Sequence, residues 1–223
     1  DNLPTSPRHP VENVSWYDAI MFCNKLSVLC GLNECYTIKD EQNNNQIVNK
    51  IESFSDKEYE VEINEKSKGY RLPSDEEWEY AARGGRSQVP FPWGGPHLRN
   101  KKGCLLANFK PGRGNYPEDG GFYTVRADAY WPNDFGLYCM SGNVAEWTSS
   151  AFYENSYTFI HDLNPDIRYD AEQSEPEAMK RKVIRGGSWK DIGYYIETGT
   201  RHWEYADSAK SYVGFRCITT FLG

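Results

Sequence analysis

The stretch GYRLPSDEEWEYAARGG, residues 69–85, contains the most complete local folding signal in the chain. Ser74 precedes three acidic residues, and Glu77 stands three positions after it, which is the spacing of a helix capping box. The acidic residues fall in the first turn, where the helix dipole favours negative charge. One helical face is apolar and is formed by Trp78, Ala81 and Ala82. The glycine pair that closes the stretch is a typical helix end, so we predict a capped helix that buries its tryptophan.

A second helix is predicted nearer the start of the chain. Ser15 and Asp18 form a capping box with aspartate in place of glutamate, and Gly31 is placed to end the helix. Its inward face is expected to contain Trp16, Ile20, Cys23 and either Leu26 or Ser27. An Asn-rich stretch at residues 40–49 indicates an exposed loop, and the alternation of residues 59–63 predicts a short strand.

Beyond the first stretch, turn residues dominate as far as about residue 150. Loops this long usually serve a function or are fixed by an ion. Two further strands are predicted at residues 182–189 and 214–220, and the acidic run at 162–177 indicates a solvated excursion. Because no internal repeat or clean linker is visible, we predict a single domain over residues 1–223.

Composition excludes several classes of protein. The chain carries 25 Lys and Arg against 32 Asp and Glu, a formal net charge of −7, which without a basic run argues against a nucleic-acid-binding surface. No apolar run is long enough to predict a membrane-spanning helix. The 7 Trp, 16 Tyr and 10 Phe argue against disorder. Four tryptophans are expected to build the core: Trp16, Trp78, Trp147 and Trp189.

Cysteine and histidine positions give no support for a zinc site. The six cysteines form no CxxC pair and the four histidines are scattered. Cys23 is expected to be a buried thiol, whereas Cys30 and Cys35 flank a turn and either stay reduced or pair. The first ten residues are polar and do not resemble a signal peptide, which leaves a mature fragment and a cytosolic protein both open.

Six motifs in order resemble one known family, the formylglycine-generating-enzyme-like (sulfatase-modifying factor) domain. They are HPVENVSWYDA at 9–19, the stretch at 69–85, PWGG at 92–95, NDFGLYCMSGNVAEW at 133–147, RGGSW at 185–189 and GFRC at 214–217. The resemblance implies an α+β, C-type-lectin-like fold with two main helices, short antiparallel strands and little regular secondary structure. The family's usual opening strand is missing, so we expect a fragment that begins inside the domain.

The resemblance also implies where catalytic residues would stand. Formylglycine-generating members bind copper through a pair of cysteines just after the GGS turn, because Cu(I) prefers thiolate ligands. Those positions hold Asp191 and Ile196 in this chain. We therefore expect no copper and no formylglycine-generating activity. The histidine ligands of the family's iron-dependent sulfoxide synthases lie in an added helical domain, and because these 223 residues contain no HxxxH pattern, we expect no iron site of that kind in this sequence.

Calcium sites are common in the family's long loops, and Ca²⁺ requires six to eight oxygen ligands. One site would use Cys139, Gly142, Val144 and Glu146, with a cysteine where relatives have an oxygen ligand. The other would use Asn108, the carbonyl of Phe109 and Asp119, with Gly121 as a further candidate ligand. The alternatives are that Glu146 hydrogen-bonds its loop, and that asparagine and aspartate side chains cap a turn.

The second half of the chain, about residues 92–223, resembles the gliding-motility lipoprotein GldK and its counterpart PorK, of the type IX secretion apparatus of Bacteroidetes. The stretches that carry this resemblance lie at 95–124, 131–152, 161–171 and 180–217. It implies a non-enzymatic subunit that is lipid-anchored on the periplasmic face of the outer membrane. Such subunits form a ring with a protein partner, GldN or PorN.

An alternative is a hypervariable ligand-binding protein diversified by a retroelement, because the same fold serves as the scaffold of such proteins. Their varied positions lie between GGSW and GFR. In this chain that segment is rich in aromatic residues, which suit protein binding: Tyr194, Tyr195, His202, Trp203, Tyr205 and Tyr212. If these residues bind a partner, they should form a solvent-exposed face, whereas residues that support the loop should be buried.

Overall fold

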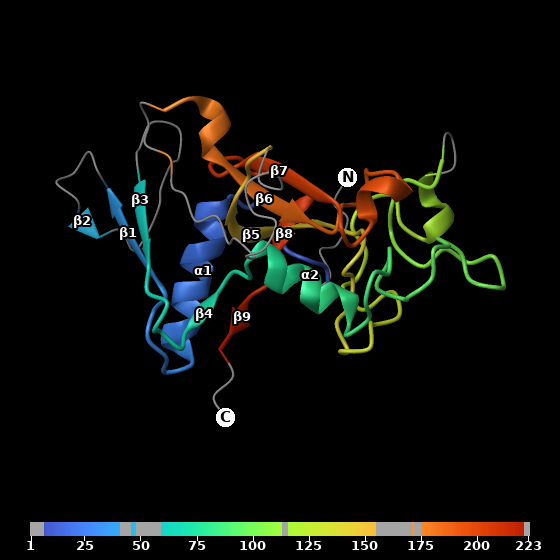
Figure 1. Ribbon diagram of the computed structural model, residues 1–223, viewed down its shortest axis with the longest axis horizontal. Helices are drawn as coiled ribbons and strands as arrows, with labels where there is room; N and C mark the ends of the chain where they lie inside the picture. The colour runs from blue at the N-terminus through green and yellow to red at the C-terminus, as the bar shows by residue number, and fades with distance from the viewer. Residues whose placement is uncertain are drawn as a thin grey trace.

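The computed structural model describes residues 7–40, 46–47, 59–112, 116–154, 171 and 175–220. Two α-helices, three short 3-10 helices and nine strands lie in these ranges (Figure 1). In chain order they are α1 (Trp16–Leu29), β1 (Tyr36–Asp40), β2 (Gln46–Ile47), β3 (Tyr59–Ile63), β4 (Tyr70–Arg71), α2 (Asp75–Arg83), η2 (Tyr116–Asp119), β5 (Ala145–Ala151), η3 (Glu177–Lys180), β6 (Arg181–Arg185), η4 (Gly193–Ile196), β7 (Arg201–Tyr205), β8 (Val213–Phe215) and β9 (Ile218–Thr219).

Both predicted helices are confirmed, and their caps explain where they begin. In α1 the Ser15 hydroxyl accepts from the Asp18 N–H, and the Asp18 carboxylate accepts from the Ser15 N–H at 3.0 Å. In α2 the same exchange joins Ser74 and Glu77. Gly84 ends α2 with φ +59°, a left-handed conformation that glycine adopts without steric cost. Because all of these signals are local, the sequence was sufficient to predict both helices.

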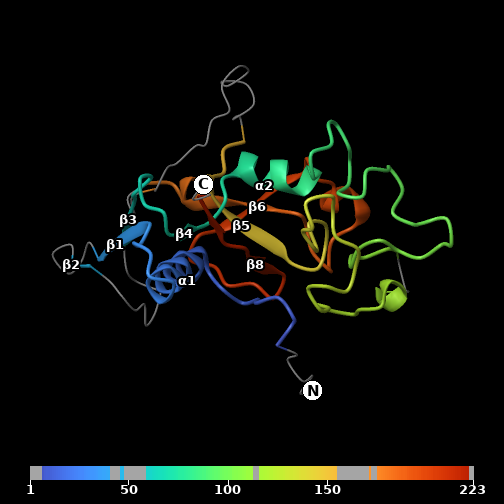
Figure 2. The same ribbon diagram turned by 90° about the horizontal axis from the view of Figure 1, so that it is seen from below.

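The strands form three separate sheets. The first is antiparallel in the order β2-β1-β3, and β4 pairs with β9 in a two-stranded ribbon. The largest has the order β7-β6-β5-β8, in which β5 and β8 are parallel and the other pairs are antiparallel. Figure 2 shows β5 and β8 of this sheet between α2 and α1.

The two predicted C-terminal strands exist but have different ends. The strand predicted at 182–189 is β6, which stops at Arg185 because Gly186 and Gly187 adopt φ values of +87° and +62°. The strand predicted at 214–220 is divided into β8 and β9, which pair with β5 and β4 respectively. The predicted strand at 59–63 is β3. The acidic run at 162–177 lies largely outside the described residues. The described part of the predicted loop at 40–49 is not an exposed loop, because Asp40 is buried at the end of β1 and residues 46–47 form β2, which pairs with β1.

The core consists of three apolar clusters, each centred on aromatic or large side chains. The largest joins α1 to β1, β5 and β6, and it contains Trp16 and Trp147, whose indole N–H groups donate to the carbonyls of Thr148 and Val14. Trp78 lies in a second cluster with Ala82 and Met140. The prediction for Trp189 was wrong, because this ring is only half buried and its N–H reaches the Ser211 carbonyl at 3.2 Å.

Long turns connect α2 to β5, and within the described part of this region η2 is the one helical element. These loops occupy the half of the molecule opposite the β1–β3 sheet (Figure 1). No helix in the described ranges is long and apolar enough to cross a membrane.

Candidate functional site

Two of the sequence motifs, at 133–147 and 185–189, meet the loop residue Asn108 at a junction of backbone hydrogen bonds. The Gly142 N–H donates to the Gly186 carbonyl at 2.9 Å, and the Asn143 N–H donates to the Asn108 carbonyl at 2.8 Å. The Trp189 N–H donates to the Asn143 carbonyl at 3.0 Å. The long loops are therefore fixed to the end of β6 through main-chain contacts.

The predicted calcium set at Cys139, Gly142, Val144 and Glu146 does not fit a hard cation. The buried Glu146 carboxylate accepts from the Trp78 indole at 2.7 Å and forms a two-point ion pair with Arg216, with one N–O distance of 2.6 Å. The Cys139 thiol donates to the Ala127 carbonyl at 3.2 Å, and burial raises its pKa to about 11. A guanidinium group thus supplies the positive charge that a cation would bring.

The second predicted set fits a cation better. Asp119 accepts from the Phe109 N–H at 2.7 Å and from the Gly121 N–H at 3.1 Å, and burial raises the pKa of this carboxyl. Asn108 is 1% exposed and donates to the Tyr123 carbonyl at 2.7 Å. Its Oδ1 has no hydrogen-bond partner in the described part of the chain, and a buried orphan oxygen is uncommon. The two hydrogen bonds that Asp119 accepts are also those expected of the alternative, in which the Asp119 side chain caps a turn without a metal.

No group of three or more His, Cys, Asp or Glu side chains that could hold a metal occurs among the described residues. The calcium hypothesis at Asn108 and Asp119 would therefore depend on amide and main-chain oxygens.

The two positions implied to hold the catalytic cysteines have structural roles. Asp191 accepts from the Ser188 N–H at 2.9 Å and from its hydroxyl at 2.6 Å, which closes the turn after β6. Ile196 is fully buried against Phe91 and Phe109. Neither side chain offers a sulfur ligand.

All six cysteines are free thiols, so Cys30 and Cys35 remain unpaired. Cys23 is buried, as predicted, and its sulfur lies 3.5 Å from that of Cys217.

The aromatic segment forms a partly exposed face on η4 and β7. Tyr194 is 65% exposed, Tyr195 is 37% exposed and His202 is also exposed. Trp203 and Tyr205 are half buried, with ring centroids 5.2 Å apart. The expectation of a solvent-exposed aromatic face therefore holds for η4 and for part of β7.

A cavity of about 580 Å³ brings four of these residues together, and we call it the aromatic groove. It is lined by Phe152, Tyr153, Glu154, Tyr194, Tyr195, Glu197, Gly199, Thr200, Arg201, His202 and Trp203. Tyr205 and Tyr212 lie outside it. The Tyr212 hydroxyl donates to Glu204 at 2.9 Å, and burial together with this carboxylate raises the pKa of Tyr212 to about 12.

Sequence reasoning missed the part of the groove contributed by the end of β5. Phe152, Tyr153 and Glu154 lie about 40 positions before η4 in the chain, and the pairing of β5 with β6 and of β6 with β7 brings them to the groove. Arg181 pairs with Glu154 at 3.1 Å and lies over the Trp203 ring at 4.6 Å. No short motif marks these residues, because the sheet alone places them together.

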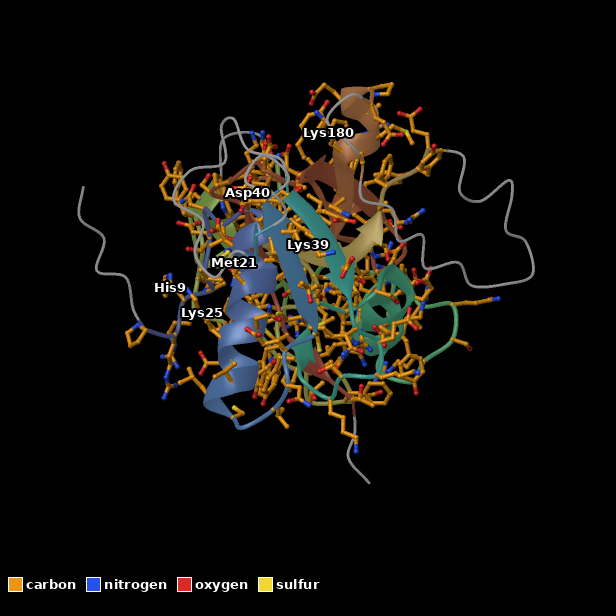
Figure 3. The ribbon with its side chains drawn as sticks, turned by 90° about the vertical axis from the view of Figure 1, so that its left-hand side faces the viewer. His9, Met21, Lys25, Lys39, Asp40 and Lys180 are labelled. Atoms are coloured by element: carbon orange, nitrogen blue, oxygen red, sulfur yellow. The ribbon has the colours of Figure 1, made fainter. Side chains whose placement is uncertain are left out.

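A second cavity of about 420 Å³ lies between α1 and β1, lined by Met21, Asn24, Lys25, Val28, Leu29, Glu34 and Ile38. Figure 3 faces this side of the molecule, with Met21 and Lys25 on α1 and Lys39 and Asp40 on β1. Its lining is mostly apolar, and none of the residues predicted to bind a partner lies there.

Comparison with known proteins places the chain in a family. The family model described as the sulfatase-modifying factor enzyme 1-like domain matches residues 1–221. The formylglycine-generating enzyme of Mus musculus is 30% identical over 220 residues, which cover 96% of this chain and 45% of the relative. The inactive C-alpha-formylglycine-generating enzyme 2 of the same organism is 32% identical, covering 69% of this chain and 44% of the relative. This chain thus spans about half the length of these relatives or less.

A solved structure, Treponema denticola variable protein 1, is similar with a TM-score of 0.71 and 29% identity, covering 97% of this chain and 73% of that one. The two helices, the short strands and this likeness confirm the α+β, C-type-lectin-like fold. The chain belongs to the sulfatase-modifying factor enzyme 1-like domain family, known for formylglycine-generating enzymes.

Proposed function

We propose that this chain is a non-catalytic protein-binding domain and that the aromatic groove is its contact site. The observation that carries the proposal is the exposed pair Tyr194 and Tyr195 beside His202 and Trp203 in one cavity. Tyrosine and tryptophan supply large contact area at low entropic cost, which suits protein recognition.

The absence of catalysis is part of the same proposal. Copper-dependent oxygen chemistry needs thiolates, and the matching positions hold an aspartate that closes a turn and an isoleucine in the core. One relative is named an inactive C-alpha-formylglycine-generating enzyme, so the family includes members without this activity. Metal analysis of the purified protein should find no copper, and copper bound in stoichiometric amount would contradict this part.

We further propose a specific setting, as a structural subunit of the type IX secretion and gliding apparatus. The support is the resemblance of residues 92–223 to the GldK and PorK lipoproteins. In this setting the partner is a GldN- or PorN-like protein, the assembly is a ring, and the subunit is attached by a lipid to the periplasmic face of the outer membrane.

The second candidate is a hypervariable ligand-binding protein, and one observation favours it. The Treponema denticola protein with a similar fold is named a variable protein, and the aromatic groove of this chain takes most of its lining from residues 194–203. Sequencing the same gene from several isolates separates the two candidates. Substitutions concentrated between residues 189 and 214 support the variable protein, whereas an unchanged segment supports the secretion subunit.

A binding experiment tests the proposal directly. The full-length protein is mixed with a GldN- or PorN-like protein, and the mass of the complex is measured by light scattering after gel filtration. The substitution Tyr194→Ala should weaken the complex. Tyr80→Ala is the matched control, because Tyr80 on α2 is 67% exposed and lies outside the groove. A wild-type protein that stays monomeric with the partner, or equal effects of the two substitutions, would contradict the proposal.

A further inference from the structure

One carboxylate of the aromatic groove is left without a counterion. Glu197 follows η4, and its half-buried side chain has neither an ion pair nor a hydrogen bond among the described residues. We propose that the groove takes a basic side chain, lysine or arginine, from the partner protein. This inference rests on the proposed function and specifies the chemistry of the partner.

The groove's other arginine and glutamate already have ion-pair partners. Arg201 pairs with Asp75, the first residue of α2, which also pairs with Arg185, and Glu154 pairs with Arg181. Among the charged side chains that line the groove, Glu197 is the one without an ion pair in the described part of the chain. An acidic partner side chain would be repelled by this carboxylate, whereas a basic one would gain an ion pair in a partly desolvated site.

The aromatic rings favour the same ligand. Tyr194 and Tyr195 contact edge to face at 5.3 Å, and Tyr195 and His202 do so at 4.8 Å. Ring faces attract cations through their quadrupole, and guanidinium groups also stack on them. Across the part of the chain that the structure describes, no lysine or arginine lies over the rings of Tyr194 and Tyr195.

The wall of the groove already shows this interaction within the molecule. The Arg181 guanidinium lies 4.6 Å from the Trp203 ring centroid and 5.3 Å from that of Phe152, while it also pairs with Glu154. An arginine held by one carboxylate and two rings is thus the arrangement that Glu197, Tyr194 and Tyr195 could offer to a partner. The tyrosine side of the groove has the rings and the acid, and it lacks the cation.

The first test uses the complex with the GldN- or PorN-like protein. Glu197→Gln should raise the dissociation constant about 2- to 5-fold, which is the effect of removing one partly exposed ion pair. Glu197→Lys should raise it further, by about tenfold or more, because it places a like charge against the ligand. The matched control is Glu34→Gln, since Glu34 is exposed between α1 and β1 and also has no ion pair in the described ranges.

The second test does not depend on a partner. N-acetyl-arginine methylamide and N-acetyl-lysine methylamide are titrated into the isotope-labelled protein, and amide shifts of residues 194–203 are followed by NMR. The neutral probe N-acetyl-norleucine methylamide reports apolar binding alone. We expect the basic probes to shift these amides more than the neutral probe, and Glu197→Gln to reduce the difference. Equal shifts from the neutral and basic probes would overturn the inference.

The two proposals fail in different ways. If Tyr194→Ala weakens the complex while Glu197→Gln and Glu197→Lys leave it unchanged, the groove binds a partner but not through a basic side chain. If none of the three substitutions has an effect, the groove is not the contact site and both proposals are wrong.

Discussion

Gly142→Ala tests the junction that fixes the long loops to the sheet. Gly142 has φ +75°, and a Cβ added there would lie 2.2 Å from the Asn108 carbonyl oxygen. Backbone atoms cannot yield as a flexible side chain can, so the two loops must separate. Gly31 is the matched control, because it has φ +71° but nothing within 4 Å of its added Cβ.

The magnitude follows from two costs. An L-residue in the left-handed region costs about 1–2 kcal/mol, and both substitutions incur this cost. Gly142→Ala should also disrupt the 2.8 Å hydrogen bond from Asn143 to Asn108 and the 2.9 Å bond from Gly142 to Gly186, each worth about 1 kcal/mol. We therefore expect a loss of about 3 kcal/mol or more for Gly142→Ala and about 1–2 kcal/mol for Gly31→Ala.

Urea denaturation followed by tryptophan fluorescence measures both free energies of unfolding, and thermal denaturation provides a second measure. For a domain of this size, a loss of 3 kcal/mol lowers the Tm by about 6–12 °C. Equal losses for the two variants, within about 0.5 kcal/mol, would refute the reasoning, because the contact with Asn108 would then have no energetic effect.

Three further predictions concern titration, thiols and calcium. Burial raises the pKa of Glu79, but the guanidinium groups of Arg185 and Arg83 outweigh burial and hold this pKa below its ordinary value. The free energy of unfolding should therefore fall as the pH drops below about 4.5, where the unfolded chain takes up the proton more readily than the folded one. Acid denaturation of Glu79→Gln should show a less steep loss than the wild type. Because the sulfurs of Cys23 and Cys217 are 3.5 Å apart, diamide should oxidise these two thiols to a disulfide. Mass spectrometry should show the loss of two hydrogens. The substitution Cys23→Ser should abolish this product, whereas Cys104→Ser should not. Asp119→Ala leaves the N–H groups of Phe109 and Gly121 without their acceptor and should cost about 2 kcal/mol in urea denaturation. If calcium binds there, CaCl₂ should raise the Tm of the wild type but not of this variant, and an unchanged wild-type Tm would contradict the calcium hypothesis at Asn108 and Asp119.

The sequence predicted those elements whose signals are local. Ser15 and Ser74 cap helices within four residues of their partners, and the alternation of residues 59–63 marks β3. Strand ends were harder to predict. Gly186 and Gly187 follow β6 directly within the RGGSW motif, and the sequence gives no sign that the strand ends at Arg185 rather than at residue 189. A Cβ added at Gly186 would lie 3.0 Å from the Trp78 ring, and one added at Gly187 would lie 2.5 Å from the Tyr195 carbonyl oxygen, and both neighbours belong to other elements.

The candidate site was predicted only in part, for the same reason. The aromatic residues of η4 and β7 were visible as a composition bias, but Glu154 enters the groove through strand pairing. The pairing of Glu146 with Arg216 joins positions 70 residues apart, and a motif that includes Glu146 says nothing about that arginine. Long-range ion pairs of this kind decide whether a carboxylate remains available for a metal.

The proposed lack of copper chemistry and the aromatic groove are connected through Ile196. This side chain is fully buried against Phe91 and Phe109, and it is the last residue of η4, directly after Tyr194 and Tyr195. A thiolate at this position would have to be charged and accessible to hold copper, whereas isoleucine gains stability from burial in the same place. The buried anchor holds the two tyrosines on a fixed turn, which lowers the entropic cost of binding. The position that the resemblance assigns to catalysis therefore supports the proposed binding surface in this chain.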